Sequence, residues 1–245
     1  MFRILLIMMI ACTVQSAKFP TDLEKCKYDD EKCYINVANT IMKRGSKGYA
    51  ELGLPVFEPL FVNKIGIDQG GDGPVVLKLH MKDVNIHGFS GVKFKAIKGL
   101  GKNIDKAKID LKYTQPIFQM IGKYTTEGKV LVLPVQGDGN CNITLVNNDC
   151  HVKLLTKKIE KNGKSYMQID KIKFNFDTTD AKIVFENLFN GNKELSDTFN
   201  LFINDNWRDI LKEIKPAMSE SIAAVYKQII NNIFGNIPYD ELFTE

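Results

Sequence analysis

The chain has 245 residues, of which 44% are hydrophobic and 25% are charged. This composition is ordinary for a folded globular protein and excludes disordered, collagen-like and low-complexity classes. Its 33 Lys and Arg residues against 29 Asp and Glu residues give a net charge of only +4. Nucleic-acid-binding proteins carry a concentrated basic footprint, so we expect no nucleic-acid partner.

The first 16 residues have the pattern of a secretory signal peptide. Arg3 precedes an unbroken apolar run at residues 4–11, and the small residues Ser16 and Ala17 suit cleavage. The apolar run is shorter than the roughly 20 residues of a transmembrane helix, and later segments are broken by charges. We therefore predict that residues 17–245 form a single secreted, extracellular domain without stable membrane insertion.

Four cysteines remain after Cys12 leaves with the signal peptide, and they enter an oxidising compartment. Cys26 and Cys33 are separated by six polar residues that can close a small loop, so we predict a disulfide between them. The simplest pairing of the others joins Cys141 to Cys150. The turn-forming residues between these two lie off centre, so an irregular loop or two unpaired thiols stay open as alternatives.

Asn142 begins the one Asn-X-Ser/Thr sequon of the sequence, Asn142-Ile143-Thr144. It is a candidate glycosylation site. If it is used, the segment lies on the surface.

The middle of the chain has the alternation of an antiparallel sheet. Residues 31–43 predict one helix, and from about residue 61 to residue 186 apolar and polar residues alternate between turn residues. Residues 106–113 show the cleanest alternation. The apolar phase switches across Asp83, which is the pattern of a β-bulge, and bulges bend sheets. We therefore expect a strongly curved sheet.

Apolar residues from Leu195 to Ile233 follow the α-helical period almost without interruption. The stripe keeps its phase across Pro216, so we predict one kinked, continuous helix over residues 197–234 rather than two helices. At ~1.5 Å per residue this helix is about 57 Å long, which exceeds the ~45 Å of a compact globule of this size. Its apolar face covers about half its circumference, so its partner must be concave.

These residues resemble the insect takeout and juvenile-hormone-binding protein family. The resemblance is carried by Cys26 and Cys33, Gly53-Leu54-Pro55, Pro59-Leu60, the run from Phe185 to Gly191, Leu195, Asn200, Phe202, Asn204, Asn206-Trp207 and the ending from Pro238 to Phe243. It covers essentially the whole mature chain. The sequence is more similar to the takeout branch than to dedicated hormone carriers, whose second disulfide joins positions farther apart than Cys141 and Cys150.

The resemblance implies an α+β fold of the TULIP-like super-roll type. In this fold a highly curved antiparallel sheet wraps a long C-terminal helix and encloses an apolar tunnel, in one elongated domain. The implied function is a secreted carrier of a terpenoid, a fatty-acid-like molecule or another lipid, in circadian, feeding or chemosensory physiology. We expect a monomer without a cofactor, with a hydrophobic small molecule as its partner and an unidentified receptor as a second candidate partner.

The candidates for the tunnel lining come from the helical stripe and from adaptable methionines on the strands. They are Phe199, Phe202, Ile210, Ile214, Met218, Ile222, Val225, Met81, Met120 and Met167. Alternatively, these side chains fill a solid core, since protein interiors are closely packed. The chain would then be a secreted, non-enzymatic interaction protein that acts through its surface on a receptor or partner.

No motif predicts an enzyme. His80, His87 and His151 have none of the spacings of metal sites. The run Gly88-Phe89-Ser90-Gly91 does not fit the G-x-S-x-G pattern of a nucleophile elbow, because Val92 stands where the second glycine would be. We therefore assign neither catalytic residues nor metal ligands.

Overall fold

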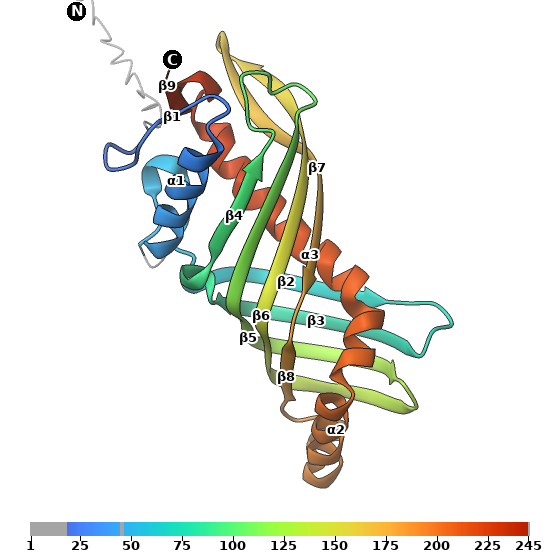
Figure 1. Cartoon of the computed structure of the whole chain (residues 1–245). Helices are drawn as coiled ribbons and strands as arrows, with labels where there is room; N and C mark the ends of the chain where they lie inside the picture. The colour runs from blue at the N-terminus through green and yellow to red at the C-terminus, as the bar shows by residue number, and fades with distance from the viewer. Residues whose placement is uncertain (1–18, 45–46, 245) are drawn as a thin grey trace, which may run out of the picture.

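Residues 19–44 and 47–244 are described in a computed structural model of the chain (Figure 1). The α-helices are α1 (Glu31–Lys43), α2 (Lys193–Asp205) and α3 (Trp207–Asn236), and short 3-10 helices lie at Ala50–Leu52, Phe89–Gly91, Phe189–Gly191 and Tyr239–Leu242. The strands are β1 (Cys26–Lys27), β2 (Leu60–Gln69), β3 (Val75–His87), β4 (Lys93–Lys98), β5 (Lys108–Val130), β6 (Leu133–Lys161), β7 (Lys164–Asp177), β8 (Asp180–Phe185) and β9 (Phe243–Thr244). The predicted signal peptide lies outside the described residues.

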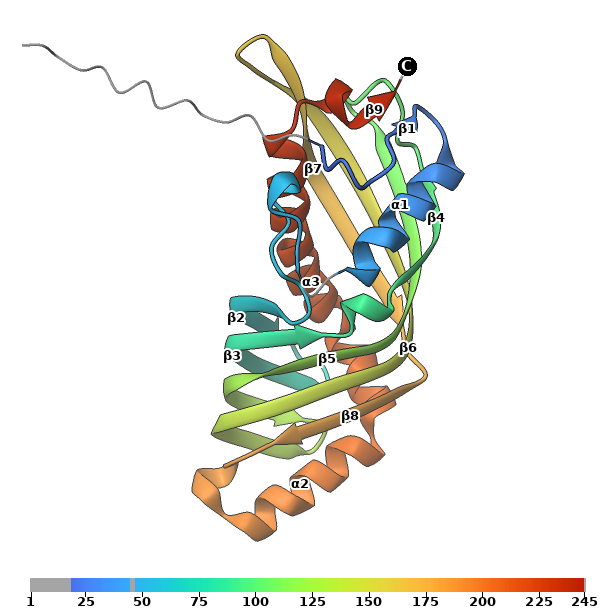
Figure 2. The ribbon, with the colours of Figure 1, turned by 90° about the vertical axis from the view of Figure 1, so that its left-hand side faces the viewer.

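Seven strands form one antiparallel sheet in the order β2-β3-β5-β6-β7, with β4 paired to β5 and β8 paired to β6. The strands β5 and β6 are 23 and 29 residues long and run through the whole sheet. Their upper halves pair with β4 and β7, and their lower halves pair with β3 and β8 (Figure 1). Figure 2 shows the sheet curving around α3, which confirms the predicted wrapped arrangement.

The sheet bends where β5 passes from one neighbour to the other. On β5, Pro116 lies between Thr114, the last residue that pairs with β4, and Gln119, the first that pairs with β3. Its missing N–H therefore removes no hydrogen bond to either of these strands. Opposite it in β6, Asn147 takes a positive φ of 53°. The buried positions of β5 change phase across this point, from Gln115 to Phe118. The bend therefore turns both halves of the long strands toward the same interior.

The predicted bulge at Asp83 is confirmed. The residue has a φ of 52°, and the register between β3 and β5 shifts between Lys82 and Asn85. Both strands keep their apolar side chains on the inner face across the shift, because one extra residue restores the phase.

The helical stripe forms two helices rather than the predicted single helix over residues 197–234. The break lies at Asn206, whose φ of −109° departs from helical values and whose Nδ2 donates to the Phe202 carbonyl at 2.8 Å. Continuity across Pro216 is confirmed, since it lies inside α3 on the exposed side. The bend lets α2 follow β8 while α3 crosses the sheet (Figure 2). At ~1.5 Å per residue, the 30 residues of α3 span about 45 Å.

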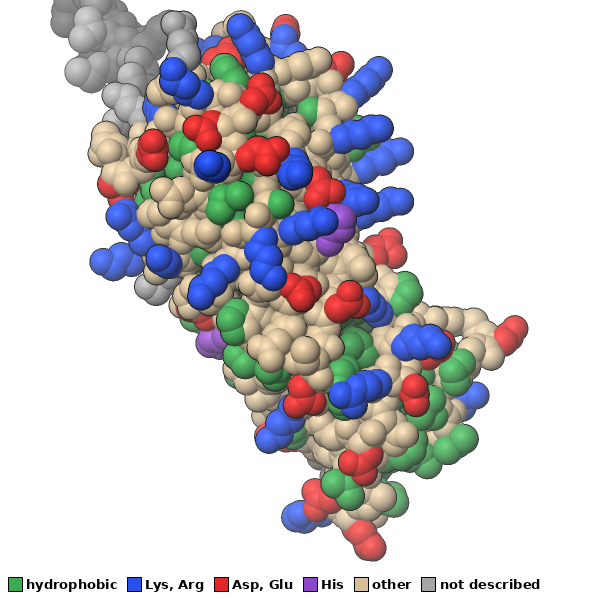
Figure 3. Space-filling view, viewed as in Figure 1, with side chains coloured by type: hydrophobic (Ala, Val, Ile, Leu, Met, Phe, Trp, Pro, Cys, Tyr) green, Lys and Arg blue, Asp and Glu red, His purple; other side chains and the backbone are tan. Residues whose placement is uncertain are grey.

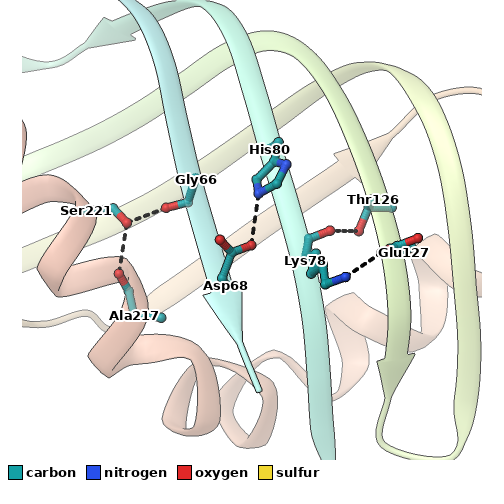
Figure 4. Close-up of polar contacts among 8 residues, drawn as sticks. All are labelled: Gly66, Asp68, Lys78, His80, Thr126, Glu127, Ala217 and Ser221. Atoms are coloured by element: carbon teal, nitrogen blue, oxygen red, sulfur yellow. Dashed lines mark hydrogen bonds and ion pairs between the residues drawn. The ribbon is translucent and has the colours of Figure 1, made fainter.

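The sheet does not close on itself, and α3 bridges its two open edges. The Ser221 hydroxyl lies within hydrogen-bonding distance of two carbonyls, that of Gly66 on β2 and that of Ala217 in its own helix, and shares its one proton between them (Figure 4). On the other edge, Asn231 Oδ1 accepts from the Ile169 N–H of β7 at 2.7 Å. These bonds satisfy backbone groups that an open sheet edge would leave unpaired.

The edge of β8 is covered in the same way by two asparagines of α2. Asn200 and Asn204 are four residues apart and therefore share one helix face. Each side-chain amide donates to and accepts from one backbone residue of β8: Asn200 pairs with Phe185 at 2.8 and 2.9 Å, and Asn204 pairs with Ile183 at 2.6 and 2.9 Å. The two amides thus make the hydrogen bonds to β8 that a neighbouring strand would otherwise make.

At the upper end of the molecule, the N-terminal and C-terminal segments of the described chain pack against each other. The predicted disulfide Cys26–Cys33 is confirmed and ties β1 to the first turn of α1. The strands β1 and β9 pair in parallel, and the Tyr28 hydroxyl donates to Asp240 at 3.0 Å. The N-terminal segment, α1 and the C-terminal segment therefore form one cover over the upper end of the sheet.

The predicted disulfide between Cys141 and Cys150 is wrong. Both residues lie on the continuous strand β6, nine positions apart, a separation that spans up to about 30 Å at ~3.3 Å per residue. A disulfide requires Cα atoms within about 7 Å. Both thiols are free and buried, as the alternative of two unpaired thiols anticipated.

These thiols are expected to resist alkylation in the folded protein. Burial raises the pKa of Cys141 and of Cys150 to about 12, so both are protonated and unreactive at pH 8. We expect iodoacetamide at pH 8 to label neither thiol in the folded protein and both in guanidinium chloride, as measured by intact mass. Absence of labelling in denaturant would show that the second disulfide exists.

Candidate functional site

The interior between α3 and the concave face of the sheet contains three cavities in a row along the helix. The upper chamber has a volume of about 230 Å³, the lower chamber about 60 Å³, and the middle cavity between them about 10 Å³. All three are lined mainly by apolar side chains. An apolar, concave site with few polar groups is the usual form of a small-molecule binding site.

The lower chamber lies between α2, the first half of α3 and the lower sheet. Trp207, Ile210 and Met218 of α3 face Ile67 and Leu77 of the sheet across it. Thr126 supplies the one hydroxyl of its lining, and Thr126 Oγ1 donates to the Lys78 carbonyl at 3.1 Å (Figure 4). The Thr126 hydroxyl is therefore already paired, and the indole N–H of Trp207 is the other side-chain polar group of this lining.

The upper chamber lies between α1, the end of α3 and the upper sheet. Val37, Ala38 and Ile41 of α1 form one wall, and Ile230 and Phe234 of α3 form another. The other lining residues are Phe19, Glu24, Cys26, Tyr34, Leu52, Phe94, Ile97, Leu100, Ile109, Leu111, Leu154, Met167, Ile233, Leu242 and Phe243. Glu24 is exposed, so the chamber reaches the surface beside the N-terminal segment.

Aromatic residues separate the two chambers. The hydroxyls of Tyr113 on β5 and Tyr226 on α3 lie 3.1 Å apart and hydrogen bond to each other. The ring of Tyr226 packs edge-on against Phe174 and Phe89, with centroids 5.4 and 6.4 Å away. Burial raises the pKa of both tyrosines, so their hydroxyls stay neutral. The interior is thus divided by an aromatic wall rather than open as one tunnel.

The predicted lining residues fall into two groups. Phe199, Ile210, Ile214 and Met218 line the lower chamber, Ile222 lines the middle cavity, and Met167 lines the upper chamber. Phe202, Val225, Met81 and Met120 line none of the three. Met81 and Met120 are almost fully buried between the central strands, where they fill the core.

The residues predicted from the sequence include few that line the larger chamber and none from α1. The larger chamber is lined by the end of α3 and by α1, yet the candidates came from the first two thirds of the stripe. A signal was present, because Val37 and Ile41 repeat at helical spacing, and Ile230 and Phe234 continue the stripe. Gln115 and Asn148, which line the middle cavity, were also missed.

Charged side chains of the outer face pair with each other. Asp68 and His80 are joined at 2.9 Å and Lys78 and Glu127 at 2.8 Å (Figure 4). The other histidines likewise face carboxylates: His151 lies 2.8 Å from Asp110, and His87 lies 3.6 Å from Glu58. Figure 3 shows basic and acidic side chains interspersed on this face, with a row of basic ones along the upper edge near β7. The two pairs drawn in Figure 4 are exposed and contribute little to stability.

Within residues 19–44 and 47–244, no group of three or more His, Cys, Asp and Glu residues is placed to hold a metal ion. None of the described helices is both long and apolar enough to span a membrane.

The comparisons with known proteins agree with this architecture. The profile of the family "Haemolymph juvenile hormone binding protein (JHBP)" matches residues 4–244. The circadian clock-controlled protein daywake of Drosophila melanogaster is 30% identical over 241 residues, which cover 96% of this chain and 92% of daywake. Its counterpart in Drosophila yakuba is 28% identical over 232 residues, covering 93% and 89%.

A crystal structure of a relative has the same fold. Takeout 1 of Epiphyas postvittana superimposes with a TM-score of 0.74 at 27% identity, over 91% of this chain and all of Takeout 1. The family profile and the daywake match each cover nearly the whole chain. The chain therefore belongs to the haemolymph juvenile hormone binding protein family, as a member similar to takeout proteins.

Proposed function

We propose that the protein is a secreted carrier that holds one elongated hydrophobic small molecule in its apolar interior. The observation that carries this proposal is the upper chamber, a 230 Å³ apolar space that reaches the surface and has a single charged lining residue, Glu24. The name of the family, which refers to binding of juvenile hormone, supports a lipophilic ligand.

Burial alone gives such a ligand moderate affinity. Transfer of a twelve-carbon chain from water contributes about 10 kcal/mol at ~0.8 kcal/mol per methylene. Association costs at least about 4 kcal/mol in translational and rotational freedom. The remaining ~6 kcal/mol corresponds to a dissociation constant in the tens of micromolar, so tighter binding requires polar contacts as well.

Secretion and physiology form part of the same proposal. Residues 1–16 have the pattern of a signal peptide, and the paired Cys26 and Cys33 suit an extracellular protein. The similarity to daywake, which is named as circadian clock-controlled, supports a role in circadian physiology. Asn142 lies half-buried on the outer face of β6, and we retain it as a candidate glycosylation site.

The proposal is tested by displacement of the fluorescent lipophile N-phenyl-1-naphthylamine from the purified protein. We expect the dye to bind and a panel of terpenoids and long-chain lipids to compete, with the best compounds at or below tens of micromolar. If the dye does not bind and no compound protects the protein against heat, the interior is a filled core. The protein would then act through its surface on a receptor or partner.

A further inference from the structure

Two buried amide side chains at the bend of the sheet have unpaired polar atoms. Gln115 of β5 is 1% exposed and Asn148 of β6 is 2% exposed, and they are direct partners across the two strands. Among the described residues, Gln115 Nε2 and Asn148 Oδ1 have no hydrogen-bond partner. Both residues line the middle cavity, together with apolar side chains such as Phe118, Leu145 and Ile222.

The orientation of Asn148 follows from its neighbours. Its Nδ2 donates to the carbonyls of Gln115 at 3.0 Å and Leu145 at 3.2 Å. Carbonyl oxygens only accept, so the NH₂ group must face them and the Oδ1 atom must face the other way. The protein therefore presents a fixed hydrogen-bond acceptor at the middle cavity, and Gln115 presents a donor beside it.

Three buried side-chain atoms have no partner among the described residues: Gln115 Nε2 and Asn148 Oδ1 belong to the lining of the middle cavity, whereas Ser219 Oγ belongs to a residue that lines none of the three cavities. In the upper chamber the Tyr34 hydroxyl donates to the Lys27 carbonyl at 2.9 Å, and in the lower chamber Thr126 is paired. The two tyrosine hydroxyls of the aromatic wall pair with each other. A buried polar group without a partner is costly, so a ligand group that pairs with Gln115 and Asn148 gains affinity over one that does not.

The chemistry that fits is a group that both donates and accepts. A hydroxyl donates to Asn148 Oδ1 and accepts from Gln115 Nε2. Esters, ketones, ethers and epoxides only accept, so they leave Asn148 unpaired, and hydrocarbons pair with neither. A carboxylate would be a buried anion without a cation among the lining residues of this cavity, which is strongly unfavourable.

We propose that Gln115 and Asn148 recognise the hydroxyl group of the carried lipophile, so that the protein selects long-chain or terpenoid alcohols over matched ethers, esters and hydrocarbons. This inference rests on the proposed carrier function. The middle cavity shares Leu145 with the lower chamber, and Tyr226, which lines the middle cavity, lies one helical turn before Ile230 of the upper chamber. Its volume of about 10 Å³ is near the size of one oxygen-sized group.

The test compares three probes of nearly equal size by displacement of N-phenyl-1-naphthylamine: 1-dodecanol, its isomer 1-methoxyundecane, and n-tridecane. We expect the natural protein to bind the alcohol at least about tenfold more tightly than the ether. This comparison needs no substitution. Equal affinities within threefold would overturn the inference and leave the carrier function standing, whereas failure of all three probes to compete would contradict both.

Gln115→Met tests the donor of this pair, because methionine has nearly the same shape and no N–H. Both 1-dodecanol and 1-methoxyundecane accept from Gln115 Nε2, so we expect the variant to bind each of them at least about fivefold more weakly and to leave the affinity for n-tridecane unchanged. Gln136→Met, the same change at an exposed position of β6, is the matched control and keeps the natural affinity for all three probes. An unchanged affinity for 1-dodecanol in Gln115→Met would show that a bound water or a Gln115–Asn148 bond satisfies these amides instead.

Discussion

Met218→Asp is expected to lower the free energy of unfolding by at least about 4 kcal/mol, which approaches the whole stability of a typical domain. Met218 is 2% exposed and lies on the face of α3 that the sheet wraps. A carboxylate there has no partner and loses its hydration, whereas a surface helix would tolerate it. The loss is measured by urea denaturation, or as the absence of a cooperative thermal transition.

Two control variants separate burial from chemistry. Leu201→Asp places the same charge on α2 at a side chain that is 66% exposed, and we expect a change within about 0.5 kcal/mol. Met218→Leu conserves volume and is expected to cost less than about 1.5 kcal/mol. If Met218→Asp and Leu201→Asp melt alike, α3 is not enclosed by the sheet.

The defect of Met218→Asp has a defined pH dependence. Burial raises the pKa of the introduced carboxyl in the folded state above the ~3.9 of the unfolded chain. The folded variant then binds more protons than the unfolded one in the window above pH 4, so its stability falls as pH rises. The difference from the natural protein is therefore expected to be smaller at pH 4 than at pH 8. Equal differences would indicate a purely steric defect.

Ala38→Trp is expected to weaken the binding of long lipophiles at least tenfold while the protein remains folded. Ala38 lies on α1 and lines the upper chamber, so the indole ring takes up space that the ligand would use. Overpacking costs about 1 to 3 kcal/mol, less than the stability of a typical domain. The measurement is displacement of N-phenyl-1-naphthylamine by 1-dodecanol, with a thermal melt on the same sample.

The matched control is Ala224→Trp, which adds the same ring to the exposed side of α3. We expect its affinity to equal that of the natural protein. Unchanged binding in Ala38→Trp would place the ligand in the lower chamber, contrary to the assignment made from the cavity volumes.

The sequence predicted the long elements well and their ends poorly. Helical periodicity reports which residues face a common neighbour, and α2 and α3 face the same sheet, so the stripe runs on through Asn206. The break depends on the side-chain bond from Asn206 to the Phe202 carbonyl, which periodicity does not contain. The prediction that the helix continues through Pro216 was correct. A proline on the exposed side of a helix removes one backbone hydrogen bond without disturbing the buried face.

The second pair of cysteines shows the limit of local pattern. Residues between Cys141 and Cys150 include turn formers, and isolated turn formers within an apolar run favour a loop. In the structure Asn147 bends a continuous 29-residue strand without ending it. Strand continuity there comes from pairing with β5, β7 and β8, segments far apart in the sequence.

The sequence predicted an apolar interior lined by the helix, but it did not predict where the cavities lie along that interior. Alternation along β5 places Gln115 in the same phase as Ile109 and Tyr113, so a polar residue on the apolar face was visible in the sequence. That its partner would be Asn148 depends on the register of β5 and β6. The volumes of the chambers depend on how side chains from α1, α3 and the sheet meet, which no periodicity reports.

Native mass spectrometry of the protein secreted from insect cells, followed by organic extraction and identification of the bound compound, tests the carrier function most directly. We predict one lipophile per protein molecule, released by extraction and carrying a hydroxyl group. A protein that is reproducibly empty, and that takes up neither terpenoids nor long-chain lipids when offered them, would contradict a ligand-binding interior.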